Sequence, residues 1–168
     1  EDAKVTAQFQ AIKEFLTSGN TTQKQHSTDL SEIEQSFIYL ISQNKSKLIK
    51  GILDILKQEN ARKQFITSFS ISTIRDSISK LFGSKAQDYL HFHDSLKTLL
   101  PYTNTFSISD DLVYRFSFNH FLESFLQSGR SKMHSRTFGL QLFSNITKYD
   151  IRSDHELILQ WKTALSKT

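Results

Sequence analysis

Six histidines are the residues best suited to bind a metal ion or to transfer protons. His91 and His93 stand two positions apart, which on a helix separates their side chains by about 200°. They therefore cannot bind one ion on an intact helix. The chain has no cysteine and no H-E-x-x-H motif, and no recurring zinc pattern surrounds the other histidines, which are His26, His120, His134 and His155. We predict no metal site.

Serine is abundant, but the motifs of nucleophilic serine enzymes are missing. Residues 77–80 read S-I-S-K, which matches S-x-x-K without the companion motifs of that enzyme class. There is no G-x-S-x-G elbow, no G-x-G-x-x-G motif and no phosphate-binding loop. The sequence therefore predicts a non-enzymatic protein with no catalytic residue and no cofactor.

Positive charge is most concentrated between two predicted helices, in residues 130–136. Its cationic or titratable side chains are Arg130, Lys132, His134 and Arg136. Such a segment before a helix N-terminus can bind a phosphate group or an acidic protein surface. Alternatively, it is a solvated connector whose cations lie near the negative end of the preceding helix. We predict these four residues as a partner-binding site and leave the connector as the open alternative.

The overall charge does not point to a nucleic-acid or membrane ligand. The net charge is +4 and the isoelectric point about 9.3, but the 21 basic and 17 acidic residues are interspersed. This mixture is typical of a solvated surface. The aromatic residues lie on predicted core stripes rather than among the basic residues, which argues against a stacking platform for single strands. No apolar run approaches about 18 residues, so no membrane span is expected.

The composition predicts an all-α protein. One proline and five glycines leave few helix breakers, and Phe, Leu and Ile recur at spacings of three and four residues. We expect a compact bundle of eight to nine short helices in one module, residues 1–168, with a sub-boundary near 101–107. The chain starts at Glu1 rather than at a methionine, so we expect it to be a fragment of a longer multi-module chain.

Apolar spacing and capping residues place the helices. Asn60 and either Ser70 or Ser72 are predicted N-caps, because their side chains can accept a hydrogen bond from a free backbone N–H. Apolar residues cover nearly the whole circumference of the helix predicted over 109–128, so we expect it at the centre of the bundle. The predicted helices lie near residues 2–18, 29–42, 45–58, 60–69, 70–82, 84–100, 109–128, 135–149 and 153–165.

Three glycines, Gly19, Gly83 and Gly129, are predicted to stop helices. Gly19 and Gly129 end two similar stretches, F-L-T-S-G and F-L-Q-S-G. The apolar register is not kept afterwards, since Thr28 and Phe138 stand nine residues after the two glycines. We interpret the stretches as two helix ends and not as two copies of a repeat.

Three longer stretches, in this order, resemble a module of the tape-measure proteins of bacterial, Bacteroidetes-type contractile injection systems, which are particles similar to phage tails. One departure follows Gly19, where N-T-T-Q stands in place of the Leu-Pro-Trp-Trp usual in that family. The stretches are AIKEFLTSG (residues 11–19), ENARKQFITSFSISTIRDSISKLF (59–82) and FNHFLESFLQSGRSKMHSRTFGLQLFSNITKYDIRSDHELI (118–158).

This resemblance implies a non-enzymatic structural protein that contributes to tube and sheath length control or to end-complex assembly. Its partners would be inner tube, cap or baseplate proteins, with no membrane and no nucleic acid. It would be located in the bacterial cytoplasm during assembly, and then within or at the end of the particle. The competing hypothesis is a stand-alone helical module that docks an acidic protein or a nucleic acid through residues 130–136. A third class, a carried effector, has no catalytic constellation to support it.

Overall fold

The prediction of an all-α protein is confirmed. In the part of the chain that the structure describes, there are seven α-helices with defined bounds, one 3-10 turn and no strand, and residues 138–139, 141–142 and 144 are also α-helical. The predicted count of eight to nine helices is not matched within this part. The structure is a computed structural model that describes residues 2–19, 30–96, 109–128, 138–139, 141–142 and 144.

The helices are short and follow the predicted order. Residues 84–100 are not one helix as predicted, because a 3-10 turn precedes α6. The helix predicted over 153–165, most of that over 135–149 and the boundary near 101–107 lie outside the described residues. The elements are α1 (Asp2–Ser18), α2 (Leu30–Ser42), α3 (Ser46–Leu56), α4 (Glu59–Ser68), α5 (Ile71–Phe82), η1 (Gly83–Ala86), α6 (Gln87–Ser95) and α8 (Asp110–Ser128).

A side-chain cap marks the start of α5 but not that of α4. Ser70 is the N-cap of α5, and its hydroxyl accepts a hydrogen bond from the backbone N–H of Thr73. The prediction that Asn60 is an N-cap is wrong, because α4 begins one residue earlier and Gln58 precedes it without a side-chain cap. Glu59 in this first turn is favoured by the positive end of the helix dipole, which explains the earlier start.

Two of the predicted helix-stop glycines are described. Gly19 follows α1 with a φ of 71°, and Gly83 follows α5 with a φ of 55°. L-residues with side chains adopt these angles at a cost, so glycine suits both positions. At Gly83 the chain leaves the α-helix and tightens into η1. Gly129 lies outside the described residues.

The helices at the N-terminal end enclose an aromatic cluster from α1, α2 and α4. Phe69, which directly follows α4, lies 5.1 Å from the ring centroids of both Phe37 and Phe65 and 6.1 Å from that of Phe15. All four side chains are buried. On α3, a Cβ at Gly51 would lie 2.8 Å from Cζ of Phe9, so glycine lets α1 approach α3 closely.

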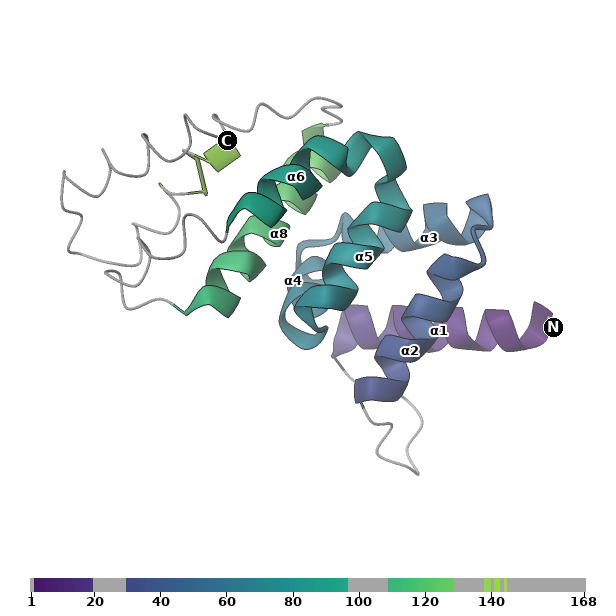
Figure 1. The fold of residues 1–168 in the computed structure, drawn as a ribbon. Helices are drawn as coiled ribbons and strands as arrows, with labels where there is room; N and C mark the ends of the chain where they lie inside the picture. The colour runs from purple at the N-terminus through teal and green to yellow at the C-terminus, as the bar shows by residue number, and fades with distance from the viewer. Residues whose placement is uncertain are drawn as a thin grey trace, which may run out of the picture.

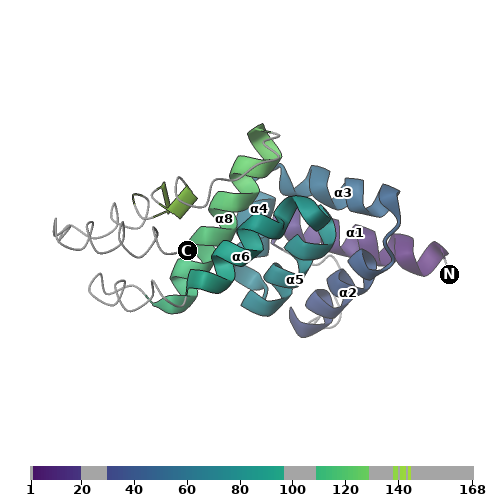
Figure 2. The same ribbon diagram turned by 45° about the horizontal axis from the view of Figure 1, so that its top comes forward.

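A second aromatic cluster joins α5, α6 and α8. The rings of Tyr89 and Phe121 stack with centroids 4.1 Å apart, and Phe82 lies 4.7 Å from Phe125. Helix α8 contacts α3, α4, α5 and α6, as expected for a helix with apolar residues on several sides, but Leu112 near its start is 41% exposed. α6 and α8 run side by side, on the side of α5 away from α1 (Figures 1 and 2).

None of the described helices is long and apolar enough to cross a bilayer. The apolar stripes instead face neighbouring helices. In α2, for example, Ile33, Phe37, Leu40 and Ile41 recur at helical spacing and are all buried.

Candidate functional site

The predicted basic site cannot be compared with the fold. Arg130, Lys132, His134 and Arg136 lie outside the described residues, so their role as a partner-binding site stays a prediction. Among the described residues, no group of three or more histidine, cysteine, aspartate or glutamate side chains could hold a metal ion. The remaining candidates are buried polar groups and two surface hollows.

The histidine pair on α6 divides between the surface and the core, as its spacing predicts. His91 is exposed, whereas His93 is 4% exposed and stacks on Phe118 with ring centroids 4.4 Å apart. Nδ1 of His93 is buried and has no hydrogen-bond partner. Burial lowers the pKa of His93 to about 4, opposed by the nearby charge of Asp94. The imidazole is therefore neutral near pH 7 and acts as a core side chain.

Several hydroxyl groups on α5, α6 and α8 are buried, as His93 is. The Tyr89 hydroxyl and Ser117 Oγ lie 3.0 Å apart, and both side chains are buried. Burial raises the pKa of Tyr89. Ser77, the first residue of S-I-S-K, is buried and donates to the Thr73 carbonyl at 2.6 Å. These groups stabilise packed helices and are not exposed to a substrate.

Replacing His93 with phenylalanine should flatten the pH dependence of stability. The unfolded state has an ordinary histidine pKa near 6.5, above the folded value of about 4, so it binds more protons between these values. The wild-type free energy of unfolding should therefore fall as pH drops through this window. Urea denaturation at several pH values should show a smaller fall for the variant. Equal slopes would contradict the burial of a neutral His93.

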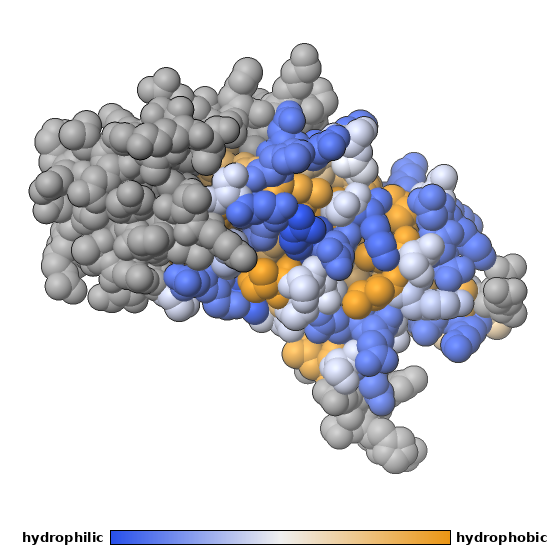
Figure 3. Space-filling model, viewed as in Figure 1, coloured by the Kyte–Doolittle hydropathy of each residue, from blue (hydrophilic) through white to orange (hydrophobic). Residues whose placement is uncertain are grey.

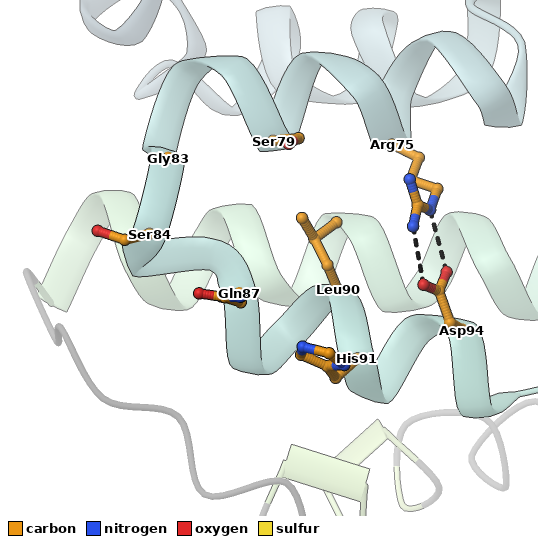
Figure 4. Close-up of a pocket in the computed structure, with 8 residues that line it drawn as sticks. All are labelled: Arg75, Ser79, Gly83, Ser84, Gln87, Leu90, His91 and Asp94. Carbon is orange, nitrogen blue, oxygen red and sulfur yellow. Dashed lines mark hydrogen bonds and ion pairs between the residues drawn. The ribbon is translucent and has the colours of Figure 1, made fainter.

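The larger described hollow, of about 460 Å³, lies between α5, η1 and α6. Figure 4 shows Arg75 and Asp94 pointing toward each other across it from α5 and α6. Arg75 Nε lies 3.0 Å from Oδ1 of Asp94, and Nη2 lies 2.7 Å from Oδ2. Hydrogen bonding from Arg75 holds the pKa of Asp94 below its ordinary value. Because Arg75 is already paired with Asp94, it is not available to bind an anion in this hollow. The ion pair instead links α5 to α6.

Two further arginines hold the C-terminal ends of helices. Arg62 is 2% exposed, and its Nη1 lies 3.4 Å from the carbonyl oxygens of both Leu56 and Lys57 at the end of α3. Arg115 donates in the same way to the carbonyl of Phe69, at 3.0 Å, beyond the end of α4. A cation at a helix C-terminus is favoured by the helix dipole. Both side chains are therefore structural.

The second hollow is an open groove of about 340 Å³ between α3, α5, η1 and α8, which we call the lysine-rimmed groove. The exposed side chains of Lys50 in α3, Lys57 directly after α3 and Lys85 in η1 form its rim. Asp54 also lines it and lies 2.7 Å from Nζ of Lys57. Its apolar floor consists of Leu53, Leu81, Phe82, Phe125 and Leu126.

This groove was not predicted from the sequence. One signal was present in the sequence, since Lys50, Leu53 and Lys57 recur at helical spacing and share a face of α3. The rest of the groove comes from residues about 30 and 70 positions further along the chain. Helical periodicity does not reveal which distant helices meet.

Comparisons of the chain with protein-family models, with curated proteins and with solved structures gave no significant match. The resemblance to tape-measure modules therefore rests on the three stretches quoted above. Function has to be argued from the fold and the groove, because folds of this general class serve many functions.

Proposed function

We propose that the chain is a non-enzymatic assembly module that works by binding other proteins. The observation that carries this proposal is the contrast between polar side chains that bind within the helical body and those that stay at its surface. Arg62, Arg75, Arg115 and His93 are engaged within the helical body, whereas the lysine-rimmed groove presents cations and apolar groups together at the surface. A surface of this kind suits contact with a protein.

The resemblance supplies the assembly in which such a module would act. We propose a contractile injection particle, with inner tube, cap or baseplate proteins as partners and with assembly in the bacterial cytoplasm. A single helical rod of 168 residues would span about 250 Å. The packing of α4 against α1, α3 and α8 instead supports a folded body acting at one end of the particle or before the tube closes. The alternative function, docking through residues 130–136, has no further observation in its favour.

In-frame deletion of residues 1–168 from the gene that encodes them tests this proposal. We expect fewer complete particles and defective ends, while the surviving particles keep their length, as measured by negative-stain electron microscopy. Particles that are intact but shorter by about 250 Å would show that the segment measures length as a rod. If the bacterium that encodes this chain makes no such particle, the tape-measure hypothesis is wrong.

A further inference from the structure

The rim of the groove has a regular spacing on α3. Lys50, Leu53 and Lys57 are separated by three and four residues, so they form one stripe along the helix. The two lysines are seven residues apart, which corresponds to about two turns and roughly 10 Å along the axis. A second helix lying along this stripe would meet positive, apolar and positive side chains in turn.

The floor of the groove is partly open to solvent. Phe125 and Leu126 near the end of α8 are half-buried, and Leu53 beside them is also half-buried. The C-terminal end of α8 lies beside α3 in Figure 2, and the two helices are in contact. Elsewhere, on the face shown in Figure 3, apolar side chains reach the surface as separate patches among hydrophilic ones. A local groove with a charged rim is therefore a more specific contact site than a broad apolar face.

The charge of the rim defines the partner. Lys57 pairs with Asp54, but Lys50 and Lys85 form no ion pair with the described residues. Three lysines and one aspartate leave a net charge of +2 around an apolar floor. Acidic groups beside apolar groups would complement this surface. An acyl chain would need a closed apolar cavity, whereas an open groove with charges spaced along a helix suits a second helix.

We propose that the lysine-rimmed groove binds an amphipathic α-helix of a partner protein, with acidic residues seven positions apart and an apolar stripe between them. The acidic residues face Lys50 and Lys57, and the apolar residues contact Leu53 and Phe125. The pair between Lys57 and Asp54 is exposed, so the Lys57 ammonium can donate to a second carboxylate. This inference rests on the proposed function, since it defines the partner surface of an assembly module.

Selection from a phage-displayed library of helical peptides, each about three heptads long, tests the groove. The probes are the recovered peptides, synthesised with a fluorescent label and titrated with the 168-residue chain by anisotropy. We expect the recovered peptides to carry acidic residues seven positions apart beside an apolar stripe. Binding should weaken as salt is added, because exposed charges are screened. Failure to recover binders, or recovery without this acidic pattern, would overturn the proposal.

A charge-reversed rim shows whether the peptides bind at this site. The combined change Lys50→Glu, Lys57→Glu and Lys85→Glu should weaken binding at least about tenfold, because the two proposed charge contacts become repulsive and the rim charge at Lys85 is reversed as well. Equal binding by wild type and this variant would overturn the proposal. If the variant does not fold, judged by circular dichroism, Lys50→Gln with Lys85→Gln replaces it, because that change retains the ion pair between Lys57 and Asp54.

The matched control is Lys4→Glu, Lys13→Glu and Lys63→Glu. These lysines are also exposed, the net-charge change is the same, and Lys63 loses its ion pair with Glu59 as Lys57 loses its own. This control should bind within about twofold of wild type, since local contacts dominate screened exposed charges. Equal losses in the two triple variants would indicate a general charge effect and would overturn the assignment to the groove.

Anionic vesicles, of phosphatidylcholine with phosphatidylglycerol, distinguish a lipid ligand. Vesicle binding that depends on the rim lysines, without peptide binding, would overturn the proposal.

The proposals for the groove and for the assembly role can also fail separately. If deletion impairs assembly but no acidic helix binds, the groove assignment is wrong. If the peptides bind but deletion leaves particles unchanged, the assembly role is wrong.

Discussion

Replacing Phe69 with alanine is expected to lower the free energy of unfolding by about 3–5 kcal/mol. The side chain is fully buried and contacts the rings of Phe15, Phe37 and Phe65. Alanine would leave a cavity where α1, α2 and α4 meet, and the surrounding helices can close it only in part. Urea denaturation followed by circular dichroism measures the change.

Leu112→Ala is the control for loss of an apolar side chain. Because Leu112 is 41% exposed, its replacement should change the free energy of unfolding by no more than about 0.5 kcal/mol. Comparable losses at Phe69 and Leu112 would contradict the assignment of Phe69 to the core.

Phe69→Ala also tests the proposed function, because it retains chain length while weakening the fold. If folded structure matters and length does not, this variant should impair particle assembly.

Replacing Arg62 with alanine should cost about 3 kcal/mol of folding stability. The buried guanidinium donates to the last carbonyl groups of α3 and approaches Glu123 to 4.0 Å. Alanine would remove these interactions together with the packing of a long side chain. The C-terminal end of α3 would lose the cation that hydrogen-bonds its carbonyl groups. The free energy of unfolding and amide hydrogen exchange in α3 would report the effect.

Two further variants separate the contributions of Arg62. Arg62→Met retains most of the volume but leaves the carbonyls unpaired, so we expect a loss of about 1–2 kcal/mol. Glu123→Gln removes the ionic partner, whose side chain is 47% exposed, and should cost about 0.5 kcal/mol or less. A Glu123→Gln loss as large as that of Arg62→Ala would show that the ion pair, and not the hold on α3, is the main contribution.

These stability predictions bear on the groove as well. Arg62 fixes the end of α3 near Lys57, and Phe82 belongs both to the groove floor and to the aromatic cluster with Phe125. A helix-binding surface built in this way depends on the packed state. Variants that loosen α3 should therefore weaken peptide binding even when no rim lysine is changed.

Helical content and the inward faces could be predicted from the sequence. Three- and four-residue spacing identifies apolar stripes, and Ile33, Phe37, Leu40 and Ile41 of α2, which have this spacing, are buried. Local hydrogen-bonding chemistry narrowed the start of α5 to Ser70 or Ser72, and the structure assigns the cap to Ser70. The Asn60 prediction was wrong because several nearby polar residues can begin a helix, and short-range propensity separates them weakly.

The sequence by itself determined that the described part of the chain is helical and which face of an amphipathic helix such as α2 turns inward, because both depend on residues within a few turns. The tertiary structure alone decided that Arg62 is buried against the end of α3, and that Leu53, Phe82 and Phe125 form one floor beneath Lys50 and Lys85. A period of 3.6 residues specifies a face but not its partner. The partner is selected by side-chain packing among helices far apart in the chain.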